Sequence, residues 1–198
     1  MIAITTSTKY HDLLKITLPQ NCRFFEKWYI ITHPDDHETI NVINGYSNIE
    51  MILYDFYSNN KIFNKGGAIQ MVQKRIPSGT HVLLLDSDIY LPDNFLELLP
   101  RLEPDKLYGP AVRHDFYSHD NFKLDKPDKI YKSDFHGFFQ LYIQTPERLY
   151  AESNDASICD DVFRDKFHRI NRVRLSIIPK HLGRDKVNWK GRNKIDFS

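Results

Sequence analysis

Cysteine is scarce in this sequence, since only Cys22 and Cys159 occur among 198 residues. They form no metal-spaced pair and no disulfide framework, which fits a reducing compartment. An excess of charge of one sign is also missing, because 27 Lys and Arg face 26 Asp and Glu and the formal net charge is +1. The protein as a whole is therefore not built to hold nucleic acid or an acidic membrane surface, and its substrate must be recognised locally.

Long hydrophobic runs are absent as well. No segment approaches the roughly 18 to 20 uncharged apolar residues that span a bilayer. The N-terminus passes from Met1 almost directly into the polar residues 5–8, without the basic, apolar and cleavage regions of a signal peptide. We therefore expect a cytoplasmic protein.

The composition is that of an ordinary globular domain, with 41% hydrophobic and 13% aromatic residues. This is enough to build a packed core and excludes disorder as the main state. The length suits one sizeable domain, and no internal repeat is present.

Short apolar runs alternate with segments of helical period, a rhythm typical of strands joined by crossover helices. The pattern predicts strands at residues 2–4, 28–32, 51–54, 82–85, 107–112, 138–143 and 173–178. It predicts helices at residues 10–18, stopped by Pro19, at 34–45, at 66–76, from Pro92 to 102, and at 157–170 with Ser157 as cap. The four apolar residues 82–85 suit a strand covered on both faces, and residues 113–132 are expected to form a long functional loop over the active site or facing the acceptor. The fold class is thus a single α/β domain with a mainly parallel central sheet.

The clearest chemical motif is Asp86-Ser87-Asp88, directly after the expected strand at 82–85. Residues two apart in an extended segment point to the same side, so both carboxylates can face one ligand. Ligands of open α/β sheets gather at the carboxyl ends of strands, and a divalent cation would relieve the repulsion between the two acids. A strand-ending turn with Asp side chains bonded to nearby backbone explains the triplet equally well.

Other stretches accompany this triplet in a definite order. Residues 64–68 read Asn-Lys-Gly-Gly-Ala before a helix, Pro92 follows the triplet, and Cys159-Asp160-Asp161 and His181-Leu182-Gly183 come later. Together these motifs resemble the GT-A glycosyltransferases, in particular the family 2 type of nucleotide-sugar transferases, over most of the chain. The resemblance implies a Rossmann-like GT-A fold and a metal-dependent transfer of a sugar from a nucleotide diphosphate sugar, with UDP as the default nucleotide, to an acceptor hydroxyl.

The resemblance also implies a metal site made by Asp88, His181 and Asp86. Asp88 would bind the cation directly, Asp86 would act through water or bind the ribose, and His181 would supply a nitrogen that suits manganese somewhat better than magnesium. A cation there would stabilise the negative charge that builds up on the departing diphosphate. Taken alone, His181 is more simply interpreted as a surface histidine in a basic loop.

A general base is implied at Asp160 and Asp161. Asp161 matches the carboxylate that takes the proton of the acceptor hydroxyl in the family. Asp160 stands where the family more often has Glu, which leaves open which of the two acts. A base of this kind implies inversion at the anomeric carbon, although acids in the first turn of a helix are also favoured by the helix dipole alone.

The nucleotide is implied to contact Thr5 and Thr6 after the first strand, Asp36 after the second strand, and Lys65 at the diphosphate. Each of these residues could equally be a helix cap or a solvated charge.

The resemblance further implies an acceptor side floored by the strand that begins at residues 137–140, Gly-Phe-Phe-Gln, whose aromatic rings could stack on sugars or belong to the core. Residues 1–182 are accordingly expected to form the catalytic domain, and the basic tail, residues 183–198, to pack on or near the active site. Residues 188–192, Asn-Trp-Lys-Gly-Arg, could fold over the diphosphate or remain solvated.

Three other functions stay open. The sequence His33-Pro34-Asp35-Asp36 resembles the zinc motif of N-deacetylases of the LmbE type, but those enzymes also need His-x-x-His, which this chain lacks, and they carry the motif after the first strand. A sugar nucleotidyltransferase would use a similar sheet, but residues 5–9 lack its usual glycine-rich signature. A binding module without catalysis would not depend on Asp161.

The acceptor is left undetermined among a growing saccharide, a lipid-linked sugar, a protein and a modified nucleobase. A core this short leaves room for a partner protein or an oligomer that completes the acceptor site, although no sequence feature marks an interface.

Overall fold

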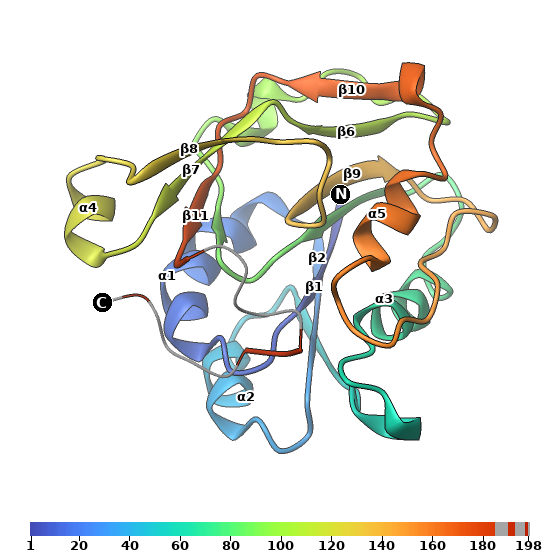
Figure 1. Ribbon diagram of the computed structural model, residues 1–198, viewed down its shortest axis with the longest axis horizontal. Coiled ribbons are helices and arrows are strands. Elements are labelled where there is room, and N and C mark those ends of the chain that lie inside the picture. Colours follow the sequence, from blue (N-terminus) through green and yellow to red (C-terminus); the bar gives the residue numbers. More distant parts are fainter. Residues whose placement is uncertain (185–189, 193–196, 198) are drawn as a thin grey trace.

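The structure is a computed structural model that describes residues 1–184, 190–192 and 197, and it has an α/β fold around a seven-stranded sheet (Figure 1). The strand order is β10-β6-β9-β4-β1-β2-β3. The strands are β1 (Ile2–Thr6), β2 (Lys27–Thr32), β3 (Ile49–Leu53), β4 (His81–Leu85), β6 (Leu107–Pro110), β9 (Phe139–Ile143) and β10 (Arg172–Leu175). Only β9 runs antiparallel to its neighbours, β4 and β6. The predicted α/β class with a mainly parallel, Rossmann-like central sheet is therefore confirmed.

A second, four-stranded sheet has the order β5-β11-β7-β8. Its strands are β5 (Ile89–Tyr90), β7 (Val112–Phe116), β8 (Lys129–Lys132) and β11 (Lys180–Leu182). Because β5 follows β4 after three residues, and β7 follows β6 after one, this sheet continues the C-terminal ends of two central strands. It carries the short helix α4 (His119–Lys123) on its outer side, away from the central sheet (Figure 1).

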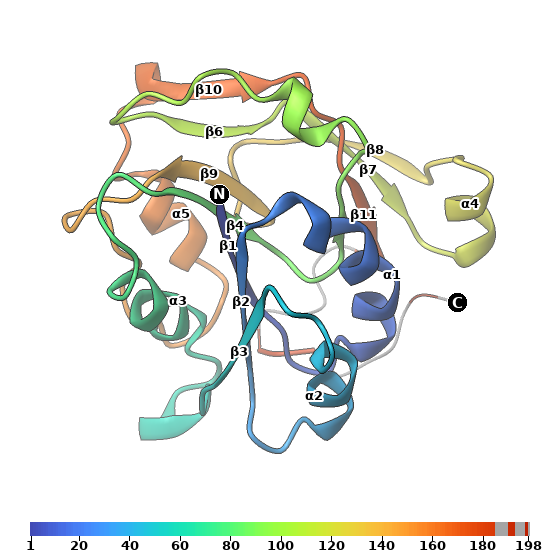
Figure 2. The ribbon, with the colours of Figure 1, turned by 180° about the vertical axis from the view of Figure 1, so that it is seen from behind.

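Helices cover both faces of the central sheet (Figures 1 and 2). One face carries α1 (His11–Asn21) and α2 (His37–Ile43), and the other carries α3 (Lys65–Gln73) and α5 (Cys159–Arg164). Along β4 the side chains alternate between two cores, so that Leu83 shares one cluster with Leu14 of α1 while Leu84 shares the other with Val72 of α3. The apolar run at 82–85 is therefore buried on both sides, as predicted.

Two helix boundaries near the N-terminus differ from the prediction. Pro19 lies inside α1 rather than ending it, because the helix continues to Asn21, whose buried side chain bonds to the neighbouring chain segment at residues 89–91. Tertiary contacts thus outweigh the backbone bond that proline cannot make. Helix α2 starts only at His37, because the carboxylate of Asp36 accepts a bond from the amide of Thr39 and caps the helix.

Two later helices are shorter than predicted. The helix expected from Pro92 is a single 3-10 turn at Phe95–Leu98, because Leu99 precedes a proline and adopts an extended conformation. The helix expected at 157–170 is only α5, and Ser157 bonds to Asp155 instead of capping it. Further 3-10 turns lie at Cys22–Phe24, Ser58–Asn60 and Arg169–Asn171.

The prediction of a long loop at 113–132 is wrong, because this stretch holds most of β7, α4 and β8. The strand expected at 173–178 ends at Leu175, and a further strand, β11, follows within the basic end of the chain. No helix in the described residues is both long and apolar enough to cross a membrane. Of the predicted tail, residues 185–189, 193–196 and 198 lie outside the described residues.

Candidate functional site

A cavity of about 330 Å³ lies beside the C-terminal ends of β1 and β4. The predicted residues that line it are Thr6, Lys65, Asp86, Asp88, Asp160, Asp161 and His181. They come from five separate stretches of the chain, and the shared cavity brings them together. The position agrees with the tendency of α/β sheets to bind ligands at their carboxyl edge.

Asp88 and His181 meet because of the small sheet. Strand β5 begins at the residue after Asp88 and pairs with β11, which contains His181. The backbone amide of Leu182 donates to the carbonyl of Asp88 at 2.9 Å. The Nε2 atom of His181 consequently lies 3.5 Å from Oδ2 of Asp88, and both side chains are buried.

The two side chains shift each other's pKa. Burial opposes the charged form of His181, but the negative charge of Asp88 and a contact with Asp115 outweigh it and raise the pKa of His181 to about 9. Burial likewise opposes the charged form of Asp88, yet His181 and Arg113 hold the pKa of Asp88 below its ordinary value. Without a bound cation the pair is therefore charged near neutral pH, and a cation would have to displace the proton from Nε2 of His181.

The donor atoms at this point suit a divalent cation. The Oδ1 atom of Asp88 is buried and has no hydrogen-bond partner among the described residues, and a buried oxygen of this kind calls for a partner. The described residues contain no group of three or more His, Cys, Asp or Glu placed to hold one ion. Since Mg²⁺ usually takes one or two carboxylates and completes its shell with water and substrate phosphates, Asp88 and His181 fit a cation whose other ligands come from substrate and water.

Lys65 takes up the other carboxylate of the triplet. Its Nζ atom lies 3.1 Å from Asp86 and 3.1 Å from Asp160, and it is buried at the first turn of α3, which Asn64 caps. Burial alone would lower the pKa of Lys65, but the two carboxylates raise it well above its ordinary value. Burial raises the pKa of Asp86 to about 6 despite the opposing charge of Lys65.

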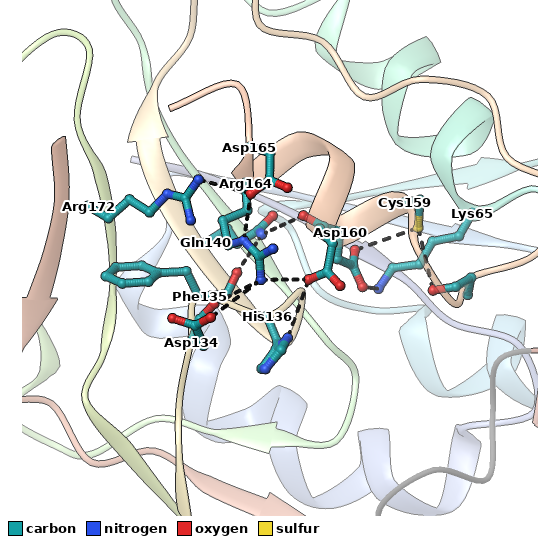
Figure 3. A network of polar contacts seen from close by, with 12 residues as sticks. Lys65, Asp134, Phe135, His136, Gln140, Cys159, Asp160, Arg164, Asp165 and Arg172 are labelled. Atoms are coloured by element: carbon teal, nitrogen blue, oxygen red, sulfur yellow. Dashed lines mark hydrogen bonds and ion pairs between the residues drawn. The ribbon is translucent and has the colours of Figure 1, made fainter. Parts of the chain in front are cut away.

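Asp160 and Asp161 lie in the first turn of α5 but face different surroundings. Figure 3 shows Asp160 beside Lys65. Asp160 is 19% exposed and contacts both Lys65 and the hydroxyl of Tyr150, at 2.9 Å. Asp161 is 42% exposed, accepts a bond from Arg164 at 2.9 Å, and lies 3.5 Å from Nδ1 of His136. Asp161 is thus the carboxylate that is more open to an incoming molecule.

Gly137 makes room for the carboxylate of Asp160. A Cβ atom at position 137 would lie 1.9 Å from Cγ of Asp160, closer than atoms can approach. The predicted floor segment at 137–140 therefore contributes a close backbone approach. Phe138 and Phe139 both belong to the core, and Phe138 also lines the cavity.

Two predicted nucleotide contacts lie elsewhere. Thr5 points to the opposite side of β1 from Thr6, where its hydroxyl donates to the carbonyl of Leu85 and accepts from Trp28 in the core. Asp36 caps α2 and lines a neighbouring pocket of about 610 Å³. Thr8 and Arg192 line both pockets, so Asp36 lies next to the main cavity rather than in it.

The zinc-type motif at 33–36 belongs to this neighbouring pocket. His33 lies 3.5 Å from Asp55 and 3.8 Å from Asp35, while Asp36 is occupied as the helix cap. The described residues around it offer no cluster of three metal ligands.

Part of the predicted tail reaches the cavity. Gly191 and Arg192 line it, and the buried guanidinium of Arg192 pairs with Asp12 of α1. Asn188 and Trp189 of the predicted diphosphate cover lie outside the described residues.

Several lining residues were missed by sequence reasoning. Tyr10, Arg113, Tyr131 and His136 line the cavity, and Tyr150 holds Asp160 from behind it. None belongs to a motif; the only signal was the expectation that the stretch at 113–132 is functional, and it contains Arg113 and Tyr131.

No family model and no curated protein match this chain. Similar solved structures include the galactosyltransferase LgtC in complex with donor and acceptor sugar analogs, with 14% identity, a TM-score of 0.47, and coverage of 89% of this chain and 68% of that chain. The inositol-1-phosphate CTP transferase of T. maritima has 10% identity, a TM-score of 0.48, and coverage of 93% and 89%. The glycosyltransferase GlyE of Streptococcus pneumoniae TIGR4 has 13% identity, a TM-score of 0.45, and coverage of 88% and 44%. These neighbours are transferases of sugars or nucleotides, but a likeness this remote carries no argument about the activity of this chain.

Proposed function

We propose that the protein is a metal-dependent glycosyltransferase that moves a sugar from a UDP-sugar to an acceptor hydroxyl with inversion at the anomeric carbon. The observation that supports this most is the meeting of Asp88 and His181 in one cavity with Asp160 and Asp161. Such a transfer requires two ligands for a cation, a place for the departing diphosphate beside that cation, and a carboxylate that takes the proton of the acceptor.

Asp88 and His181 are the residues that would hold Mn²⁺ or Mg²⁺. The bound cation would supply positive charge opposite the diphosphate that leaves. The cavity lining otherwise balances four aspartates against four Lys or Arg, so a bare diphosphate gains little net attraction from it.

Asp161 is the residue that we assign as the base. It is the more exposed of the two acids on α5 and can accept the proton of an alcohol that enters from solvent. Asp160, which Lys65 and Tyr150 hold in place, keeps Lys65 beside Asp86 at the leaving-group side.

The nucleoside is assigned to the junction of the two pockets. Thr6 lines the main cavity and Asp36 the neighbouring one, and Thr8 lines both. A nucleotide laid across this junction reaches from Asp36 to the diphosphate position near Asp88.

The test is incubation with a panel of nucleotide sugars and Mn²⁺, with the released nucleotide diphosphate and the glycosylated product as readouts. One UDP-sugar is expected to be turned over only when the metal is present. Asp161→Ala should lower turnover about 100-fold or more while sparing UDP affinity, and Asp88→Ala should abolish metal-dependent UDP binding. Asp120→Ala, which removes an exposed acid of α4 that does not line the cavity, is the control and should leave turnover unchanged.

Other outcomes would identify the alternatives. Pyrophosphate release from a nucleoside triphosphate and a sugar phosphate would indicate a nucleotidyltransferase, and acetate release that depends on zinc would indicate a deacetylase. If Asp88→Ala leaves both binding and transfer intact, the proposed site is wrong.

A further inference from the structure

Asp115 is a buried carboxylate to which sequence reasoning assigns no role. It lies on β7 with no exposed surface, and it pairs with His181 in the parallel ladder between β7 and β11. Residues opposite each other in neighbouring strands present their side chains on the same face of the sheet. The Oδ1 atom of Asp115 accordingly lies 3.3 Å from Nδ1 of His181.

Arg113 anchors this carboxylate on its other side. The Nε atom of Arg113 donates to the same Oδ1 atom at 2.8 Å, and its guanidinium lies 4.6 Å from the ring centres of both Tyr131 and Phe138. The rings limit where the guanidinium can lie, so Asp115 is held in one place. Burying a carboxylate costs free energy of desolvation. Here the buried carboxylate lies beside Nδ1, the ring nitrogen of His181 that faces away from Asp88.

We propose that Asp115 is a positioning residue of the metal site: its carboxylate accepts a hydrogen bond from the Nδ1–H of His181 and so leaves Nε2 as the nitrogen that binds the cation. A neutral imidazole has one donor nitrogen and one acceptor nitrogen, and the partner of the first decides which is the second. This inference rests on the proposed function, because it assigns a role within the metal site proposed above.

The geometry on both sides of the ring supports this role. Nε2 faces Asp88 at 3.5 Å while Nδ1 faces Asp115 at 3.3 Å, so the imidazole lies between the two carboxylates. Nδ1 of His181 is 3.3 Å from Asp115 but is not aligned for an ordinary hydrogen bond, and it is a buried nitrogen with no hydrogen-bond partner among the described residues. Catalytic-site hydrogen bonds are often long or poorly aligned in proteins without their ligand, so the bond to Asp115 is expected to form when Nε2 binds the cation. Outer carboxylates of this kind orient a ligating histidine and strengthen its bond to the metal, typically by 10- to 100-fold in affinity.

The test measures Mn²⁺ affinity, by the electron paramagnetic resonance signal of free Mn²⁺, in the presence of saturating UDP. Asp115→Asn should weaken Mn²⁺ binding by about 10- to 100-fold. In the His181→Ala background, the same substitution should change the affinity by less than about twofold, because Asp115 acts through that ring. Asp128→Asn is the matched control, since Asp128 bonds to the amide of Tyr117 after the same strand without lining the cavity, and it should leave Mn²⁺ affinity unchanged.

Two results would overturn the inference without touching the proposed function. One is unchanged Mn²⁺ affinity in Asp115→Asn. The other is an equal loss with and without His181, which would make Asp115 a direct ligand or a structural partner of Arg113. A parent protein that binds no Mn²⁺ with UDP would instead overturn the proposed metal site together with the inference.

A measurement on the unaltered protein covers the case in which Asp115→Asn does not fold. With Cd²⁺ and UDP bound, the ¹⁵N spectrum of His181 should show a proton on Nδ1 and a cadmium-shifted Nε2. A proton on Nε2 with cadmium on Nδ1, or a ring that cadmium does not shift, would overturn the assignment.

Discussion

Lys65 shows how one buried side chain organises the acidic cavity. It is the cation between Asp86 and Asp160, at 3.1 Å from each, and it comes from the first turn of α3. Without it the two carboxylates would face each other in a poorly solvated place, where like charges repel strongly.

Lys65→Met should therefore destabilise the fold. Removing one partner of a buried ion pair leaves uncompensated charge, and we expect a loss of about 3 kcal/mol in the free energy of unfolding at pH 7. Urea denaturation measures it. Lys74→Met, at the exposed C-cap of the same helix, is the control and should change the free energy by less than about 0.5 kcal/mol. Equal stability of the two variants would contradict the assigned role of Lys65.

Gly137→Ala tests the packing against Asp160. The added methyl group would occupy the place of that carboxylate and displace it from Lys65 and Tyr150. A displacement of about 1 Å in a catalytic site commonly costs about 100-fold, so turnover of the UDP-sugar should fall by about that factor. Gly45→Ala meets no neighbouring atom but has a positive φ of 99°, so it should lose about 1 kcal/mol of stability with unchanged turnover. Equal turnover of the two variants would show that the position of Asp160 is unimportant.

Among the elements, α1 positions the segment that carries Asp86 and Asp88. The hydroxyl of Thr17 donates to the carbonyl of Ser87 at 2.7 Å. The side-chain amide of Asn21 donates through Nδ2 to the backbone carbonyl of Ile89 at 2.7 Å. Its Oδ1 atom accepts from the backbone amide of Leu91 at 3.0 Å. The edge of β5 that does not pair with β11 thus has its backbone groups satisfied by helix side chains.

Asn21→Ala should disturb this segment more than any exposed change on α1. It leaves a buried carbonyl and a buried amide without partners, which costs about 3 kcal/mol in total, and Mn²⁺ affinity should fall with it. Gln20→Ala removes a neighbouring amide that contacts the same segment at a partly exposed position, and it should cost less than about 1 kcal/mol. Chemical denaturation and Mn²⁺ titration of both variants check this. A smaller loss at Asn21 than at Gln20 would contradict it.

At the scale of the whole molecule, the cavity collects side chains from both sheets and from α3 and α5. A ligand that binds only this folded arrangement must stabilise it by mass action. At concentrations of 100 times the dissociation constant, UDP with Mn²⁺ should stabilise the protein by about 2.7 kcal/mol. For a chain of this size that raises the melting temperature by about 5 to 10 °C.

Differential scanning fluorimetry measures that shift. It should vanish in Asp88→Ala and when EDTA removes the metal, whereas Asp161→Ala should keep it. A shift of equal size with UDP alone would show that binding does not need the cation.

Much of the fold could be predicted because its signals are local. The unbroken apolar residues at 82–85 predicted a strand buried on both faces. The motif Asp86-Ser87-Asp88 indicated the edge of the sheet where ligands gather. The prediction of a loop at 113–132 failed because β8 is a largely exposed edge strand, whose polar residues give no apolar alternation. The prediction that Pro19 ends the first helix failed because the partner of Asn21 lies about 70 residues away in the sequence.

By itself, the sequence determined the α/β class and singled out the acids and the histidine that we propose for the site, because composition and period are properties of neighbouring residues. Only the tertiary structure decided that His181 meets Asp88, that Lys65 lies between two carboxylates, and that Thr5 faces the core. Those relations depend on strand pairing between distant segments and on which face each residue occupies, where a shift of one position reverses the outcome.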